Sequence, residues 1–451
     1  LRRTILDLAD QTGLLAESGA ASDLPEDDRL ARLDAYLCDV KDAQISDGLH
    51  VFGDAPGEWD GLLAALWGRF VPPGPAGAPS RGRADVLPTG RNLYAIDPRA
   101  VPTPTAMTLA ATAAAELLRR HVQDQGDYPR SLVLNLWGST TMRTGGEDLA
   151  LAMILLGVSP VRDEASGRVT GVEVIPLALL DRPRVDVTLR ISGLFRDAFA
   201  AQIELFDMAV RAVAARDEAA DWNPLAGTAR ATRIFGPAPG CYGAGLGAAL
   251  DSGRWTDRAA LGQAYLDASS TGYGLAAEGA EFAAVARTAD AFVHIQDHRE
   301  TDLLEGSEFA AHTGGFAALA DSLGAAPALY HADTGAPDAP RIRTAPEEVT
   351  RIVRARAANP LWLAGMRRHG YRGAAEIARA LDGLFAYAAT VPHRFDAQFD
   401  LLWGATLGDA DIDGFLRAAN PQARDGMAAR FDDARARGLW HPRRNDVGAA
   451  P

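Results

Sequence analysis

The sequence has few cysteines, and this scarcity disfavours two kinds of architecture. Only Cys38 and Cys241 occur among 451 residues, far apart and outside any C-x-x-C pattern. A disulfide framework and a structural zinc site are therefore disfavoured, and a reducing compartment is expected. The sequence also lacks an apolar run of membrane-spanning length and a basic-then-apolar leader after Leu1. We therefore expect a cytoplasmic protein with no membrane partner.

Lysine is scarcer still, because Lys41 is the only one and the other 44 basic residues are arginine. The phosphate-binding loop G-x-x-x-x-G-K-[S/T] requires a lysine, and no such motif occurs in the sequence. This excludes a Walker-type nucleotide site on this chain. The net charge is −14. Contacts to phosphates need a basic face, so the acidic balance argues against nucleic acid as a partner.

Length and composition indicate a globular protein of two or three domains, with 47% hydrophobic and 23% charged residues. The patterns predict three segments. Residues 1–86 are mostly helical and end in a connector rich in proline and glycine, residues 87–340 form an α/β domain that holds the two chemically rich stretches described below, and residues 341–451 form a helical domain. The expected fold class is α/β, with parallel-type sheet layers flanked by helices and with helical N-terminal and C-terminal segments.

The stretch at residues 131–161 carries the strongest local pattern. Ser131–Trp137 is a compact apolar run typical of a buried strand, Gly138–Gly146 is a polar loop, and Glu147–Leu156 is an apolar helix. A strand, a glycine-bearing loop and a helix form half of a β-α-β unit, whose loops hold ligands in α/β proteins. Glu147 and Asp148 begin the helix, where its dipole favours acids, so simple stabilisation of the first turn explains them equally well.

A second stretch, at residues 289–315, is rich in chemically active side chains. It follows a strand-like segment, Ala291–Ile295, which we expect to be parallel to Ser131–Trp137, with both C-terminal ends at one shared cleft. The composition is typical of a metal or acid–base site. A solvated acidic loop with incidental histidines is the alternative. Within the 19 residues 294–312 of this stretch lie three of the nine histidines and five acids: His294, Asp297, His298, Glu300, Asp302, Glu305, Glu308 and His312.

Together these stretches resemble one known family, the large subunit of aerobic cobaltochelatase (CobN), to which the H subunit of magnesium chelatase is related. The resemblance runs from about Leu37 to about Pro442. Because full-length members are considerably longer, it implies that the chain corresponds to their C-terminal part. The segments that carry it are Leu87–Thr103, Trp137-Gly-Ser with Thr144-Gly-Gly-Glu147, Pro239–Gly245, His294–Leu304 and Asn359–Glu376.

The resemblance implies an enzyme, a cobaltochelatase that forms metal–nitrogen bonds. It implies insertion of Co(II), the substrate metal, into a corrin-ring precursor, hydrogenobyrinic acid a,c-diamide, on the route to cobalamin. It also implies AAA+ ATPase partner subunits that hold ATP and Mg²⁺, in keeping with the missing phosphate loop here. Two alternatives stay open: a paralogue for another metal, similar to the magnesium chelatase H subunit, and a corrinoid-binding module without catalysis.

The chemistry of metal insertion assigns a role to each candidate. Removal of the ring N–H protons needs a base, Co(II) accepts imidazole and carboxylate, and the substrate's carboxylates suit arginine. We expect an ionised Glu147 to capture the metal and a histidine with a near-neutral pKa to take protons; which of His294 and His298 faces the ring stays open. Core packing is the alternative for Trp137 and Tyr242. The candidates are Glu147, His294, His298 and Glu300 for catalysis; Glu147, His294, Asp297, His298 and His312 for the metal; and Arg91, Asn92, Trp137, Arg143 and Tyr242 for the substrate.

Overall fold

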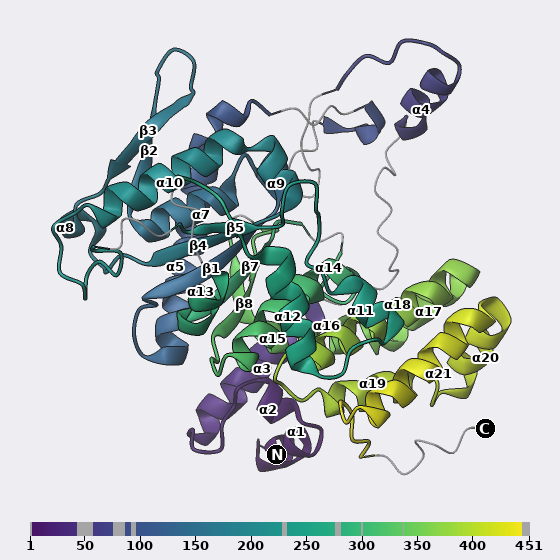
Figure 1. The fold of residues 1–451 in the computed structure, drawn as a ribbon. Helices are drawn as coiled ribbons and strands as arrows, with labels where there is room; N and C mark the ends of the chain where they lie inside the picture. The colour runs from purple at the N-terminus through teal and green to yellow at the C-terminus, as the bar shows by residue number, and fades with distance from the viewer. Residues whose placement is uncertain are drawn as a thin grey trace. The chain divides into compact units, whose positions relative to one another are not determined.

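The structure is a computed structural model that describes residues 2–42, 57–74, 86–91, 96–227, 232–275, 281–298, 301–336 and 338–443. The chain divides into two compact units, which are assembled from segments far apart in the sequence (Figure 1). Unit 1 comprises Leu1–His50, Asp302–Ala310 and Ala345–Pro451, and unit 2 comprises Val51–Thr301 and Ala311–Thr344. The division into domains at residues 86/87 and 340/341 stays a prediction.

A seven-stranded sheet in the order β6-β5-β4-β1-β7-β8-β9 forms the centre of unit 2. The five inner strands are parallel, and the two edge strands are antiparallel to their neighbours. The α/β prediction is therefore confirmed. The strands are β1 (Ser131–Leu136), β4 (Asp186–Ile191), β5 (Ile234–Gly236), β6 (Thr271–Gly272), β7 (Ala291–Gln296), β8 (Ala328–Asp333) and β9 (Arg341–Thr344), and a separate hairpin contains β2 (Val158–Arg162) and β3 (Val169–Val174).

The predicted strands at Ser131–Trp137 and Ala291–Ile295 are confirmed as β1 and β7, which pair directly with each other. Both are buried on both faces, and this is why their sequences are nearly continuous apolar runs instead of alternating ones. Because the two strands are parallel, their C-terminal ends meet at the same edge of the sheet. A cleft at that edge stays a prediction.

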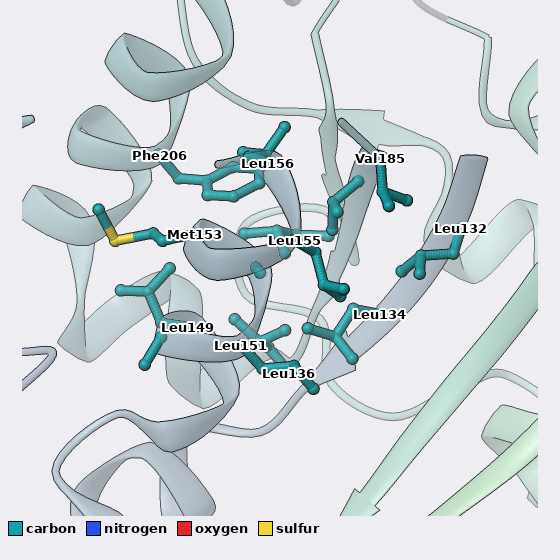
Figure 2. Close-up of a cluster of buried hydrophobic side chains, with 14 of the residues drawn as sticks. Leu132, Leu134, Leu136, Leu149, Leu151, Met153, Leu155, Leu156, Val185 and Phe206 are labelled. Carbon is teal, nitrogen blue, oxygen red and sulfur yellow. The ribbon is translucent and has the colours of Figure 1, made fainter. Parts of the chain in front are cut away.

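One face of the sheet packs on the helices α5, α7 and α10 (Figure 1). Figure 2 shows alternate leucines of β1 pointing into this core, toward the side chains of α7 and Phe206 of α10. The helix predicted at Glu147–Leu156 is confirmed as α7, and it ends at Gly157 in the left-handed conformation that favours glycine. The core residues labelled in Figure 2 are Leu132, Leu134, Leu136, Leu149, Leu151, Met153, Leu155, Leu156, Val185 and Phe206.

The opposite face of the sheet packs on α12, α13 and α15. Phe292 of β7 stacks on Phe316 of α15 with ring centroids 4.7 Å apart. Gly262 lets α12 approach α15 closely, since a Cβ there would lie 2.7 Å from the backbone of Ala318. The helices of unit 2 are α4 (Glu58–Leu66), η3 (Thr89–Arg91), η4 (Pro98–Ala100), α5 (Pro104–Gln125), α6 (Gly138–Thr144), α7 (Glu147–Leu156), α8 (Leu177–Leu180), α9 (Gly193–Ala198), α10 (Ala200–Ala214), α11 (Gly247–Ser252), α12 (Arg258–Ser269), α13 (Phe282–Thr288) and α15 (Gly315–Ser322).

The predicted loop at Gly138–Gly146 is wrong, because most of it is the helix α6. The side chain of Ser192, which follows β4, accepts a hydrogen bond from the Gly138 N–H at 3.1 Å and so satisfies a free donor at the helix start. Local sequence cannot reveal this cap, which comes from 54 residues away. Two successive glycines with positive φ, Gly145 and Gly146, then end α6 and turn the chain into α7.

Unit 1 is helical in its described part, as predicted for most of residues 341–451. The first four of those residues are an exception, because Arg-Ile-Arg-Thr alternates with the period of a strand and pairs with β8 as β9. No described helix is both long and apolar enough to span a bilayer. The helices of unit 1 are α1 (Arg2–Gln11), α2 (Leu14–Glu17), α3 (Glu26–Asp42), α14 (Ser307–Phe309), α16 (Ala345–Ile352), the π-helical segment η6 (Val353–Ala357), α17 (Pro360–Arg368), α18 (Gly370–Thr390), α19 (Asp396–Ala405), α20 (Ala410–Ala419) and α21 (Pro421–Ala436).

Candidate functional site

A row of polar side chains crosses the sheet near its C-terminal edge. The strand register places Arg190, Asn135, His294 and His331 side by side on β4, β1, β7 and β8. All four are at least 97% buried. The row two residues earlier along the strands, on the same face of the sheet, is mainly apolar, with Val133 beside Phe292. The face thus changes from packing to polar chemistry just before the strands end, where α/β proteins bind ligands.

His294 belongs to a cluster of aromatic rings above this row. Trp137, which follows β1, has its ring centroid 5.2 Å from that of His294 and 5.6 Å from that of His312. His312 lies in a π-helical segment, η5 (Ala310–Gly314), and π-helical segments often occur at functional sites. Thr313, the next residue, places its Oγ1 3.4 Å from Nδ1 of His294. The predicted residues Trp137, His294 and His312 are therefore neighbours.

Both buried imidazoles are neutral at physiological pH. Burial lowers the pKa of His294 well below its ordinary value, and the nearby His312, His331 and Arg190 lower it further. Burial and Arg190 lower the pKa of His312 in the same direction. The expectation that His294 titrates near neutral pH is therefore wrong. A neutral imidazole has a free electron pair on one nitrogen, so these side chains can accept a proton briefly or bind a metal. They are not suited to remain protonated, because burial disfavours the charged form.

A carboxylate network lies at the same edge of the sheet as the imidazoles. Asp297, just after β7, is 1% exposed, and Arg143 of α6 donates to its two oxygens over 2.7 and 2.8 Å. Thr140 Oγ1 donates to the same carboxylate over 3.2 Å. A forked arginine pair of this kind fixes a carboxylate in both position and plane. The predicted residues Arg143 and Asp297 thus act on each other, and the fork of Arg143 positions Asp297.

Asp148 is a second buried carboxyl group, and it is the residue after Glu147. Thr141 Oγ1 lies 2.9 Å from Asp148 Oδ2 and 3.0 Å from the carbonyl oxygen of Trp137. One hydroxyl proton cannot serve both acceptors, but a protonated Asp148 donates to Thr141, which then donates to Trp137. Burial raises the pKa of Asp148 to about 7, and the nearby carboxylates of Asp297 and Glu147 add to the shift. Asp148 therefore holds a proton up to about neutral pH.

Replacing Asp148 with asparagine should remove a pH dependence of stability in unit 2. The folded pKa is raised above the unfolded value of 3.8, so the folded state holds a proton that the unfolded state releases. The contribution of Asp148 to stability should therefore fall as pH rises from about 4 to about 7, by up to about 4 kcal/mol, and then level off. The neutral His294 and His312 contribute with the opposite sign in this range, but both are present in the original chain and in the variant. The stability of the original chain minus that of Asp148→Asn, measured by urea unfolding, should therefore fall across the range, and the same difference for the control Asp251→Asn, at an exposed carboxylate, should not.

The predicted residues do not all join this cluster. Glu147 does, because it is 6% exposed and its charge acts on Asp148. His298 is only half-buried. Tyr242 is 66% exposed, which contradicts core packing, and its hydroxyl donates to Asp197 over 2.8 Å. Arg91 is exposed at the end of η3. Asn92 and Glu300 lie outside the described residues.

Burial also decides between the two interpretations of residues 289–315. His294, Asp297 and His312 are each at most 2% exposed, so a solvated acidic loop is wrong for these three. Within the described ranges no three His, Cys, Asp or Glu side chains converge as a metal site. The metal ligands proposed from the sequence stay a prediction for the state in which metal and ring are bound.

Sequence reasoning missed several polar residues of the site. Asn135 is the most informative, because neither atom of its carboxamide has a hydrogen-bond partner in the described structure although the residue is 3% exposed. A buried polar group without a hydrogen-bond partner lowers the stability of the folded state by roughly 1–3 kcal/mol. One signal was available: in β1, β4, β7 and β8 a polar residue interrupts the strand one or two positions before its end. The missed residues are Asn135, Thr140, Thr141, Asp148, Arg190 and His331.

These features define an α/β protein with a buried acid and imidazole site at the C-terminal edge of its parallel strands. The family model described as CobN/Magnesium Chelatase matches residues 1–58 and 54–447. The chain belongs to this family, and the resemblance inferred from the sequence is confirmed.

Three relatives place the chain within the family. It is 50% identical over 422 residues to the aerobic cobaltochelatase subunit CobN of Pseudomonas aeruginosa, a match that covers 88% of this chain and 34% of that protein. It is 44% identical over 470 residues to CobN of Sinorhizobium sp, covering 99% of this chain and 36% of that protein. The solved catalytic subunit of cobaltochelatase from Mycobacterium tuberculosis superimposes with a TM-score of 0.84 at 40% identity, covering 99% and 39% of the two chains. The chain thus spans about a third of the length of its curated relatives.

Proposed function

We propose that this chain is the tetrapyrrole-binding, catalytic part of a cobalt chelatase, which inserts Co(II) into hydrogenobyrinic acid a,c-diamide during cobalamin biosynthesis. The observation that carries the proposal is the meeting of neutral imidazoles with buried carboxyl groups at one edge of the sheet. His294 and His312 lie against Trp137, and Thr141 links the carbonyl oxygen of Trp137 to Asp148. The charge of Asp297 acts in turn on Asp148. The names of the cobaltochelatase relatives support cobalt as the metal.

Chelation requires that two ring N–H protons leave while Co(II) exchanges its water ligands for ring nitrogens. Glu147 and Asp297 supply negative charge that attracts the cation, and Arg143 holds Asp297 in place. His294 offers a neutral nitrogen to a departing ring proton, which then passes to a carboxylate or to water. Trp137 offers an apolar surface for the ring, and Arg91 and Tyr242 offer exposed groups to its carboxylate side arms. Each of these roles is part of the proposal.

The energy source is proposed to lie on other chains. With no phosphate loop in the sequence, we place ATP and Mg²⁺ on AAA+ partner subunits that act on this chain. A cytoplasmic location fits the two cysteines, which are both free. The alternative of a paralogue for another metal predicts a different metal preference, and the alternative of a binding module predicts ring binding without insertion.

The proposal is tested by following the absorbance and fluorescence of the corrin precursor with the purified chain. Ring binding should quench fluorescence at equal amounts of ring and chain. With partner ATPases, ATP and Mg²⁺ added, Co(II) should enter the ring, and omission of ATP should stop insertion. Matched reactions with Mg²⁺ and Zn²⁺ as the inserted metal should be slower. Preference for another metal or ring binding with no insertion would select one of the alternatives, and no ring binding would refute all three.

A further inference from the structure

The chain leaves unit 2 after Thr301, passes through unit 1 as Asp302–Ala310, and returns to unit 2 at Ala311. We call Asp302–Ala310 the bridge. It ends inside a single run of helix that contains α14, η5 and α15, from Ser307 to Ser322. The first residues after the bridge are Ala311, His312 and Thr313. Two of the site's side chains therefore follow directly from a segment that belongs to the other unit.

Unit 1 holds the start of the bridge through a buried arginine. Arg356 of η6 is 2% exposed, and its guanidinium donates to both carboxylate oxygens of Asp302, over 2.5 and 2.8 Å. Glu305 lies 3.6 Å from the same guanidinium. Trp362 of α17 covers its face, with the guanidinium carbon 4.9 Å from the ring centroid. Forked pairing and stacking together fix the arginine in one orientation, which lysine cannot reproduce.

Backbone packing holds the next residues of the bridge. Leu303 and Leu304 are each 1% exposed, buried in unit 1. Gly383 of α18 lies so close that a Cβ there would be 2.5 Å from the carbonyl oxygen of Leu304. The Asp302 side chain also accepts from the Leu304 N–H over 2.9 Å. This part of the bridge thus has no room to move without a change in unit 1 itself.

The other end of the bridge leads directly into the site. His312 contacts the ring of Trp137, and Thr313 Oγ1 lies 3.4 Å from Nδ1 of His294. The partner on Nδ1 decides which nitrogen of His294 carries the proton and which stays free. The π-helical segment η5 continues directly from α14 and begins at Ala310, the last residue of the bridge, so His312 and Thr313 lie on helical backbone that the bridge begins.

We infer that Arg356 is a positioning residue for the site in unit 2, acting through the bridge on His312 and Thr313. When Arg356 holds Asp302, the helix that carries His312 stays in one position. When Arg356 releases Asp302, His312 and Thr313 can move relative to Trp137 and His294. The positioning of His312 by Arg356 follows from the contacts alone, whereas an effect on chelation rests on the proposed function.

Arg354 provides a matched control in the same π-helical segment. Its guanidinium makes a forked pair with Glu17 of α2, which is not part of the bridge. Arg356→Lys and Arg354→Lys therefore each break one forked pair within unit 1. Gly383→Ala disturbs the bridge from α18 without removing a charge, and Gly414→Ala in α20, where an added Cβ meets nothing within 4 Å, is its control.

The test is ¹⁹F NMR of the chain labelled with 5-fluorotryptophan, with the Trp137 resonance assigned by Trp137→Phe. Arg356→Lys should shift the resonances of Trp362, which it touches, and of Trp137, which it does not. Arg354→Lys should leave Trp137 unshifted. Gly383→Ala should shift Trp137, and Gly414→Ala should not, which covers the case in which Arg356→Lys does not fold.

An unchanged Trp137 resonance in folded Arg356→Lys, or in Gly383→Ala, would overturn the inference, and so would an equal shift in Arg354→Lys. In the chelation assay Arg356→Lys should lower kcat by about ten- to a hundredfold with ring affinity unchanged, the size of effect produced by misplaced catalytic groups. If Trp137 shifts but the unsubstituted chain does not chelate, the proposed function fails and the positional inference stands.

Discussion

Glu147→Gln should slow cobalt insertion by about a hundredfold or more and leave ring binding within about twofold of the original chain. Glutamine keeps the shape of glutamate and removes its charge. Glu147 is 6% exposed at the start of α7, where its backbone N–H donates to Thr144 Oγ1 over 3.1 Å. That bond does not involve the substituted side chain, so the helix start should persist. The loss should therefore come from charge that attracts the metal, and it should appear in kcat.

The measurement is the initial rate of Co(II) insertion with partner subunits and ATP, together with ring binding by fluorescence. Glu173→Gln, at an exposed glutamate of the β2–β3 hairpin, is the control for removing one negative charge from unit 2. It should insert cobalt at the original rate. If Glu147→Gln does so too, Glu147 only stabilises the first turn of α7, which is the alternative that the sequence left open.

His294→Ala should have the second large effect, with insertion lowered by about a hundredfold or more and unit 2 destabilised by roughly 2–4 kcal/mol. His294 is 1% exposed in the middle of β7, between Asn135 and His331. Its removal leaves a cavity against Trp137 and deletes the neutral imidazole of the proposed proton transfer. His298→Ala should cost little stability, because His298 is half-buried.

The two variants are compared by insertion rate at a temperature where both are folded, as judged by circular dichroism, and by urea unfolding. This comparison decides which of the two histidines acts on the ring. A larger loss of insertion in His298→Ala than in His294→Ala would contradict the assignment and move the chemistry to the loop after β7. His294→Gln, which retains a polar group of similar size, should recover part of the stability and none of the insertion.

The sequence determined the elements whose pattern is local. The strands β1 and β7 were predicted because burial on both faces produces a continuous apolar run of residues. The helix α7 was predicted because its acidic start at Glu147 and its glycine end at Gly157 are local signals. The missing phosphate loop and the family followed from sequence in the same way. The predicted loop at Gly138–Gly146 failed because the cap of α6 comes from Ser192, a contact that sequence spacing does not contain.

Only the tertiary structure determined which side chains meet at the site and which of them carry a proton. Strand register places Arg190, Asn135, His294 and His331 in one row, although they come from four strands separated by tens of residues. Burial beside Arg190 makes His294 neutral, whereas its sequence context suggested an ordinary pKa. Asp148 looked like a common first-turn acid until its contacts with Thr141 and the charges around it were known. Residue types and local periodicity are properties of the chain, but protonation depends on which groups meet and how much water is excluded, and only packing sets those.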